Sequence, residues 1–221
     1  MAKHKLARFA ENRTFTNLFQ HDNYDLQKSS FPLKGNWQKH YFKNENPIVL
    51  ELGCGKGEYT IAMSQAYPDK NFIGIDRKGA RLWRGAKTAF ERQMMNVAFL
   101  RIGIENIADF FAASEIDEIW ITFPDPQPKK ERRRLTSPQY IERYKQLISD
   151  EATINLKTDS RELYQYTLET AIALHWKIIE TIEDVYLQSS DLLLTTIQTF
   201  YEQRWVKEGK MISFIKFNVN Q

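Results

Sequence analysis

From about residue 46 onward, short apolar runs alternate with longer amphipathic stretches along the chain. Short apolar and β-branched runs predict buried strands, and helical periodicity predicts helices between them. The expected strands are Ile48–Leu52, Phe72–Asp76, Val97–Ile102, Glu118–Phe123, Thr153–Lys157, Ile178–Val185 and Ile212–Phe217. The expected helices are Glu58–Tyr67, Lys78–Gln93, Pro138–Leu147, Arg161–Leu174 and Leu192–Lys207. The alternation predicts one α/β domain over residues 46–221, a doubly wound, seven-stranded parallel sheet with helices on both faces.

Residues 1–45 show no clear strand or helix period. Basic and aromatic side chains are interleaved there, namely Lys3, Lys5, Arg8 and Arg13 with Phe9, Phe15, Phe19 and Tyr24. We expect a basic, partly ordered N-terminal arm ahead of the α/β domain, and no second folded domain. The order and the role of this arm are left open by the sequence.

One expected strand-to-helix connection carries three alternating glycines. It reads Glu51-Leu-Gly-Cys-Gly-Lys-Gly-Glu58. Gly53, Gly55 and Gly57 leave the turn without side chains, so its backbone can adopt positive φ and lie against a ligand. The spacing differs from the G-x-G-x-x-G of dinucleotide folds, and Glu51 would repel a phosphate and attract an ammonium. The alternative is a glycine turn of purely structural use.

A second acid ends the next expected strand. Asp76 lies about twenty residues beyond the glycine turn, the position at which α/β folds place an acid that accepts hydrogen bonds from ribose hydroxyls. Aspartate is also a favoured helix N-cap, so Asp76 has an alternative role at the helix that begins near Lys78.

Composition narrows the class of protein further. The chain has 221 residues, 42% hydrophobic and 27% charged, which suits a single soluble domain with an extension. No apolar run approaches the roughly 18 residues of a membrane span, so we expect a cytoplasmic protein without a membrane partner. The only cysteine, Cys54, and four histidines without ligand spacing predict neither a disulfide nor a metal site. A net charge of +3 gives weak support for an anionic partner.

A proline-rich loop with an acid and a run of cations follows the fourth expected strand. It reads Phe123-Pro-Asp-Pro-Gln-Pro-Lys-Lys-Glu-Arg-Arg-Arg134. Its prolines fix φ, which predicts a stiff loop that holds Asp125 beyond the carboxyl end of the sheet, where ligands bind. The five cations from Lys129 to Arg134 are enough to neutralise several RNA phosphates. The alternative is a solvated, charged loop.

Three segments together resemble one family. The loop F-P-D-P-Q-P-K-K-E-R-R-R-L, the turn E-L-G-C-G-K-G-E and the later N-L-K-T-D-S are similar to motifs of the bacterial tRNA (guanine-N7-)-methyltransferase family. The resemblance covers about residues 47–208. It implies the Rossmann-like sheet of the class I methyltransferases, S-adenosylmethionine as co-substrate and no metal. It also implies tRNA as partner, with methyl transfer to N7 of a guanine in the variable loop.

The resemblance also implies roles for individual residues. The cofactor would be bound by Glu51, Gly53, Gly55, Gly57 and Asp76, with Gly103 and Ile104 at the adenine edge. Asp125 would be the catalytic or cofactor-side acid. The substrate would be contacted by Lys129, Asp159, Thr199 and Glu202, of which the last two form a T-x-Y-E element. A helix cap is the alternative for Asp159, and a solvated helix face is the alternative for the T-x-Y-E element.

Two positions depart from the family pattern. Gln127 stands where the family usually has tryptophan, and Gly103 stands where it tends to place an acid or amide near the adenine, with Glu105 close enough to substitute. The competing functions are another RNA or small-molecule methyltransferase that uses S-adenosylmethionine, or an inactive RNA-binding module on the same fold. The sequence does not decide between a monomer and a homodimer, or which tRNAs are substrates.

Overall fold

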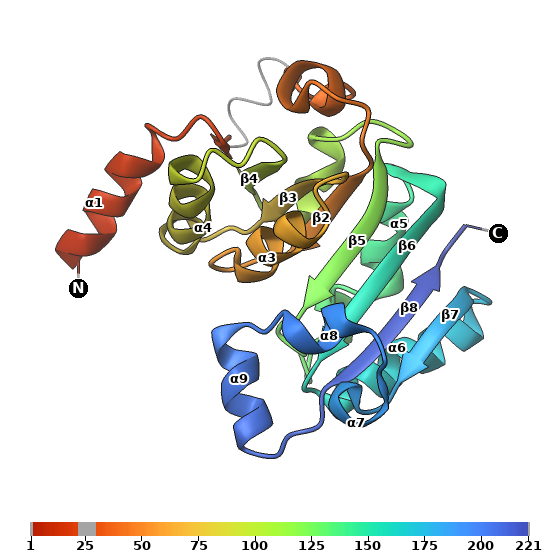
Figure 1. Ribbon diagram of the computed structural model, residues 1–221. Helices are drawn as coiled ribbons and strands as arrows, with labels where there is room; N and C mark the ends of the chain where they lie inside the picture. The colour runs from red at the N-terminus through yellow and green to blue at the C-terminus, as the bar shows by residue number, and fades with distance from the viewer. Residues whose placement is uncertain (1, 22–29, 221) are drawn as a thin grey trace.

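A single mixed sheet organises the residues that the computed structural model describes, 2–21 and 30–220 (Figure 1). Tyr24 of the expected arm lies outside these residues. The strands of this sheet run in the order β1-β4-β3-β2-β5-β6-β8-β7. Their bounds are β1 Leu18–Gln20, β2 Ile48–Leu52, β3 Asn71–Ile75, β4 Val97–Arg101, β5 Ile116–Thr122, β6 Ile148–Thr158, β7 Lys177–Ile182 and β8 Ser213–Asn218.

The α/β class is confirmed, and two details of the expected sheet are wrong. The sheet has eight strands within the described residues, where we expected seven, and β8 runs antiparallel to both β6 and β7. Strand β8 begins at the same edge of the sheet at which β6 and β7 end, since Ser213, its first residue, pairs with Thr158, the last residue of β6. A connection that does not cross the sheet has to return the chain antiparallel.

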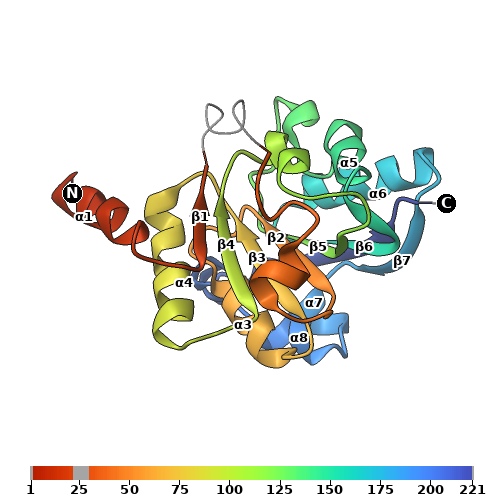
Figure 2. The ribbon, with the colours of Figure 1, turned by 90° about the horizontal axis from the view of Figure 1, so that it is seen from above.

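Helices cover both faces of the sheet, as expected. Their bounds are α1 Ala2–Asn12, α3 Glu58–Ala66, α4 Gly79–Glu91, α5 Pro138–Tyr144, α6 Arg161–Ala173, α7 Val185–Gln188, α8 Leu192–Thr196 and α9 Phe200–Lys207, with short helices η1 Trp37–Phe42, η2 Ile104–Asp109 and η3 Glu131–Arg133. Helices α5 and α6 lie on one face, and α3 and α4 lie on the other (Figure 2). Alternation along β2 serves both faces, since Leu50 packs on the α5 side and Val49 on the α3 side. No helix of the described residues is long and apolar enough to cross a membrane.

The N-terminal segment is more regular than its sequence predicted. It contains α1 beside α4 (Figure 1) and β1, which pairs with β4 and adds a strand at the sheet edge. The Asn12 amide donates to the Gly79 carbonyl at 2.8 Å, and the Glu11 carboxylate accepts from Trp83 at 2.6 Å and Lys87 at 2.7 Å. Periodicity missed β1 because three residues are too few to establish one.

The last expected helix is divided in two. Instead of one helix over Leu192–Lys207, α8 ends at Thr196 and α9 begins at Phe200. Thr199 is the N-cap of α9, and its hydroxyl accepts from the backbone N–H of Glu202. The Glu202 side chain accepts from the Thr199 N–H in return, a capping box that starts a new helix there.

Candidate active site

The predicted site residues follow strands that end at one edge of the sheet. Strands β2 to β6 are parallel, so their carboxyl ends meet there. The residues after these ends are Gly53, Gly55 and Gly57 after β2, Asp76 after β3, Gly103 and Ile104 after β4, Asp125 and Lys129 after β5, and Asp159 after β6. Helix α9, with Thr199 at its N-cap and Glu202 in its first turn, lies at the same edge. The ring of Phe123, which follows β5, packs against Trp205 of α9 with 5.1 Å between the ring centroids.

Two of the three glycines in the turn face open space. Gly53, Gly55 and Gly57 have φ values of +74°, +58° and +72°, which other residues rarely adopt. A Cβ built on Gly53 or Gly55 would meet no heavy atom within 4 Å, whereas one on Gly57 would lie 2.5 Å from the Phe99 ring. Gly57 therefore has a packing reason. Gly53 and Gly55 present bare backbone to solvent, the form of a cradle for a small ligand.

Glu51 lies beneath this turn and is only 2% exposed. Its carboxylate accepts hydrogen bonds from the Thr60 N–H at 2.8 Å, from the Thr60 hydroxyl, and from the Thr122 hydroxyl at 2.7 Å. Burial raises the pKa of Glu51 to about 7, against the opposing effect of these hydrogen bonds. The carboxylate ties the end of β2 to the first turn of α3 and to the end of β5. Sequence reasoning found Glu51 but not its two threonine partners.

Asp76 connects the glycine turn to the start of α4. One carboxylate oxygen accepts from the Gly55 N–H at 3.0 Å, and the other accepts from the Lys78 N–H at 2.7 Å. The N-cap position of α4 is occupied by Lys78 without a side-chain cap bond. Asp76 thus fixes the entry to the helix from two residues before it. Each of its oxygens has a second lone pair for another donor.

The end of β4 places an acid beside Gly103. A Cβ on Gly103 would lie 2.6 Å from the Glu105 carboxylate, which shows that the exposed Glu105 side chain folds back against this glycine. The Arg77 guanidinium lies 3.9 Å from the same carboxylate. Ile104, the first residue of η2, packs against the core. Glu105 therefore lies close beside Gly103, and its role as a substitute at the adenine edge stays a prediction.

The proline-rich loop holds Asp125 on the surface. Its carboxylate accepts from the Gln127 N–H at 3.1 Å. Phe123 and Gln127 flank it with positive φ values of 47° and 46°, an uncommon conformation for residues other than glycine. The Phe123 N–H donates to the Lys157 carbonyl at 2.8 Å and anchors the loop to β6. Asp125 is exposed, yet its backbone is fixed on both sides.

One of the five cations in this loop points inward. Arg134 is 1% exposed, donates to the Pro126 carbonyl at 3.0 Å and forms an ion pair with Glu162. Its guanidinium also lies 4.3 Å from the centroid of the Tyr166 ring. The expectation that all five cations face RNA is wrong for Arg134, which closes the base of the loop. The exposed cations are Lys129, Lys130, Arg132 and Arg133.

Asp159 does not cap α6. Ser160 is the N-cap, and its hydroxyl accepts from the Leu163 N–H at 3.2 Å. The Asp159 carboxylate instead lies 3.7 Å from the Lys210 ammonium, at the end of β6. The helix-cap alternative for Asp159 is therefore wrong, and its substrate contact stays a prediction.

Glu202 is fully buried, so the alternative of a solvated helix face is wrong for this residue, and its substrate contact stays a prediction. Its carboxylate forms an ion pair with Lys157, which is equally buried, and accepts from the Tyr186 hydroxyl at 2.8 Å. Burial raises the pKa of Glu202 while the Lys157 charge opposes the rise, and burial lowers the pKa of Lys157. The ion pair of Glu202 and Lys157 joins α9 to β6, two residues before Asp159. Sequence reasoning missed Lys157, although a lysine inside an apolar strand is itself a signal.

Comparison with known proteins gives the family. A family described as "Putative methyltransferase" matches residues 45–215. The tRNA (guanine-N(7)-)-methyltransferase of Christiangramia forsetii is 48% identical over 221 residues, which cover 99% of both chains. The protein of the same name from Bacteroides thetaiotaomicron is 44% identical, over 100% of this chain and 88% of the relative. This chain belongs to the tRNA (guanine-N(7)-)-methyltransferase family.

Solved structures similar to this family member share its fold. The 16S rRNA methyltransferase KamB superposes with a TM-score of 0.64 at 13% identity, covering 83% of this chain and 92% of KamB. A tryptophan-to-alanine mutant of the 16S rRNA (adenine(1408)-N(1))-methyltransferase from Catenulisporales acidiphilia, solved with cosubstrate SAM, has a TM-score of 0.57 at 14% identity, covering 85% of this chain and 91% of that one. At these identities the likeness concerns the fold alone. Among the described residues, no three His, Cys, Asp or Glu side chains gather as a metal site.

Proposed function

We propose that this chain transfers a methyl group from S-adenosylmethionine to N7 of a guanine in the variable loop of tRNA. The observation that carries the proposal is the open glycine cradle and the fixed Asp125 at one edge of the sheet, in a chain of this family. The glycine turn fits a small ligand, and the exposed loop beside it fits a large one.

The residues around the cradle suit S-adenosylmethionine. Gly53 and Gly55 leave space for a ligand against the backbone, and Asp76 keeps acceptor positions for two ribose hydroxyls. Glu51 is almost sealed from solvent, so it acts on a bound ammonium through its negative potential and by fixing the turn. Gly103, Ile104 and Glu105 would hold the adenine edge at the end of β4. When bound, S-adenosylmethionine supplies an electrophilic methyl group.

Methylation of guanine N7 requires little acid–base catalysis from the enzyme. It carries an exposed lone pair and no proton, so no general base is required. The task of the chain is alignment, which contributes up to roughly 7 to 11 kcal/mol at the limit of proximity effects. The stiff loop from Phe123 to Gln127 is suited to this task, because both of its flanks are conformationally fixed.

Asp125 provides the charge compensation. Alkylation at N7 leaves the purine cationic, and a fixed carboxylate stabilises that charge or accepts hydrogen bonds from the guanine N1–H and amino group. Asp159 is a second carboxylate at the same edge, and the exposed Lys129, four residues beyond Asp125, would contact a phosphate. Because bacterial tRNA is made and used in the cytoplasm, the proposed reaction takes place there.

Methyl transfer from labelled S-adenosylmethionine to unmodified tRNA tests the proposal. We expect 7-methylguanosine on nucleoside analysis, mapped to the variable loop, and no label on a tRNA whose variable-loop guanine is replaced by adenine. Label on another nucleoside would assign a different RNA methyltransferase activity. Binding of S-adenosylmethionine without transfer to tRNA would support the small-molecule enzyme or the inactive module instead.

A further inference from the structure

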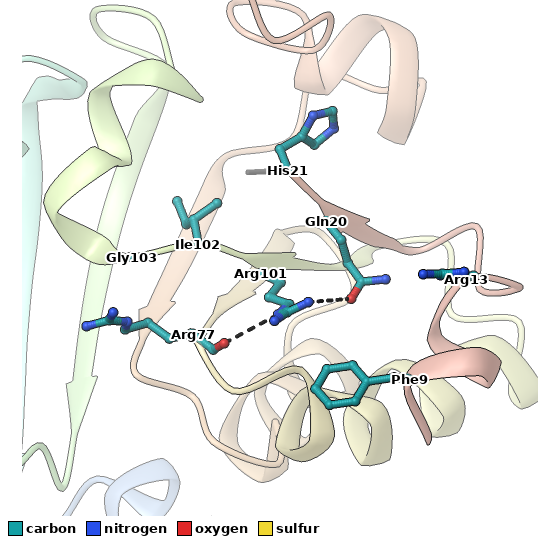
Figure 3. Close-up of a pocket in the computed structure, with 8 residues that line it drawn as sticks. All are labelled: Phe9, Arg13, Gln20, His21, Arg77, Arg101, Ile102 and Gly103. Carbon is teal, nitrogen blue, oxygen red and sulfur yellow. Dashed lines mark hydrogen bonds between the residues drawn. The ribbon is translucent and has the colours of Figure 1, made fainter. Parts of the chain in front are cut away.

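A pocket of about 690 Å³ lies beside the predicted cofactor site, on the side of the N-terminal segment. Its lining includes Phe9, Arg13, Gln20, His21, Arg101 and Gly103, drawn in Figure 3. Gln20 and Arg101 are the last residues of the parallel strands β1 and β4, so the pocket opens at the same sheet edge as the active site. Helix α1 and strand β1, which the sequence did not predict, therefore form one wall of the pocket.

Arg101 lines this pocket, and among the described residues it has no acidic partner. Its guanidinium donates to the Gln20 side-chain oxygen and the Arg77 carbonyl, both at 3.4 Å, and lies 5.1 Å from the centroid of the Phe9 ring (Figure 3). Both hydrogen bonds are long and both acceptors are neutral, so these contacts compensate its charge only weakly. Arg13 adds a second, exposed guanidinium. Within the described residues, no carboxylate lies within ion-pair distance of either arginine.

The position of Arg101 is built by packing. A Cβ on Gly79 would lie 2.8 Å from the Phe9 ring and 3.0 Å from the Arg101 side chain, so the glycine at the start of α4 admits both. The Asn12 amide, bonded to the Gly79 carbonyl, holds the end of α1 against the same point. Glu11, the nearest acid of α1 along the chain, is engaged by Trp83 and Lys87. The N-terminal segment is thus fixed with Arg13 lining the pocket and with Glu11 directed toward α4.

We propose that this pocket binds phosphate groups of the tRNA backbone, an inference that rests on the proposed function. Two guanidiniums that form no ion pair with a carboxylate of the described residues favour an anion and disfavour the cationic S-adenosylmethionine, although Gly103 lies near both sites. Arg77 lines this pocket and also the adjoining groove, where it lies 3.9 Å from the Glu105 carboxylate. The same groove is lined by three more cations, Arg132, Arg133 and Arg143. Arg132 and Arg133 of the proline-rich loop are therefore connected through Arg77 to the N-terminal pocket, and the cations of this surface outnumber Glu105, the acid that lines it.

The test uses the full chain with Arg13→Gln, Arg101→Gln and the double variant. Binding of unmodified tRNA is followed by fluorescence anisotropy over a range of salt concentrations, and methyl transfer is measured at saturating tRNA. We expect the double variant to bind about tenfold more weakly and to lose about two units of salt slope. The KM for tRNA should rise while kcat and the Kd of S-adenosylmethionine stay the same. Lys177→Gln, an exposed cation at the start of β7, is the matched control and should change none of these.

Two results would overturn the assignment. Wild-type tRNA affinity and salt slope in the double variant would remove the phosphate role, and a weakened affinity for S-adenosylmethionine would make the pocket part of the cofactor site. If Arg101→Gln impairs folding, as judged by thermal unfolding, Arg13→Gln alone decides, because Arg13 is exposed. A wild-type protein that binds tRNA with this arginine dependence but methylates no guanine would contradict the proposed function and leave the pocket assignment standing.

Discussion

The two carboxylates that define the candidate site, Glu51 and Asp125, lie in opposite environments. Glu51 is buried beneath the glycine turn, accepts three hydrogen bonds and has a pKa raised to about 7. Asp125 is exposed on a loop and accepts one hydrogen bond, from a backbone N–H two residues ahead. One carboxylate, Glu51, is therefore fixed and shielded from solvent, whereas the other, Asp125, is accessible to a substrate.

The contrast distinguishes a carboxylate that positions the backbone around a ligand from one that contacts the substrate. A carboxylate with almost all of its surface covered organises the backbone around a ligand, and its cost is the desolvation that raises its pKa. An exposed carboxylate on a fixed backbone keeps its lone pairs for a substrate that arrives from solvent. Substitutions at the two positions should therefore affect different measurements: catalytic turnover at Asp125, and stability and cofactor affinity at Glu51.

Asp125→Asn should have the largest effect. The amide keeps the size of the side chain but loses the negative charge that compensates the methylated purine, so turnover should fall by about 10²- to 10³-fold. The affinity for S-adenosylmethionine should stay within about threefold, because the glycine cradle is unchanged. Single-turnover methyl transfer and equilibrium cofactor binding measure the two separately. A large loss of cofactor affinity in this variant would move Asp125 into the cofactor site.

Glu51→Gln should act on stability and its pH dependence. The folded protein holds the Glu51 proton up to a pKa of about 7, above the model-peptide value of 4.5 that applies when the chain is unfolded. The folded state thus binds more protons between these values, and the unfolding free energy should fall as pH rises from about 4.5 to 7, by up to about 3 kcal/mol. Glu202, whose pKa is also raised, adds a slope of the same sign in both proteins.

Urea unfolding across this pH range isolates the Glu51 contribution as the difference between wild type and variant. Glu51→Gln should have the flatter profile, since it carries no titrating group at this position. It should also bind S-adenosylmethionine about tenfold more weakly, a loss of roughly 1.4 kcal/mol. Parallel stability profiles in the two proteins would show that the buried carboxyl does not titrate in this range.

Sequence pattern predicted the parts of the site that depend on local chemistry. The glycine turn, Asp76 and the proline-rich loop each follow a strand of the expected sheet, and their placement needed only the rule that parallel strands end at one edge. Strands β2 to β8 were expected within a few residues, except that β6 begins earlier, at Ile148. Their hydrophobic runs are long enough to carry a period.

The misses depend on contacts between distant residues. Arg134 looks like its neighbours in sequence, but Glu162 and Tyr166 of α6 draw it inward. Arg101 ends an apolar strand, and only the docking of α1 and β1 makes it part of a pocket. The capping box of Thr199 and Glu202 was visible as T-x-x-E, which predicts a helix start. That local signal was available, whereas the burial of Glu202 against Lys157 was not.

Lys129→Ala should give the smallest effect and extends the comparison to the loop itself. Lys129 is exposed beyond Asp125, while Arg134 at the base of the same loop is buried and paired. Removing one phosphate contact should weaken tRNA binding about threefold and lower the salt slope by about one unit, with cofactor affinity unchanged. Anisotropy titrations at several salt concentrations measure this, with Lys177→Ala as the control. An unaltered slope would mean that the exposed end of the loop is only solvated, and that RNA is bound by the arginines farther along it.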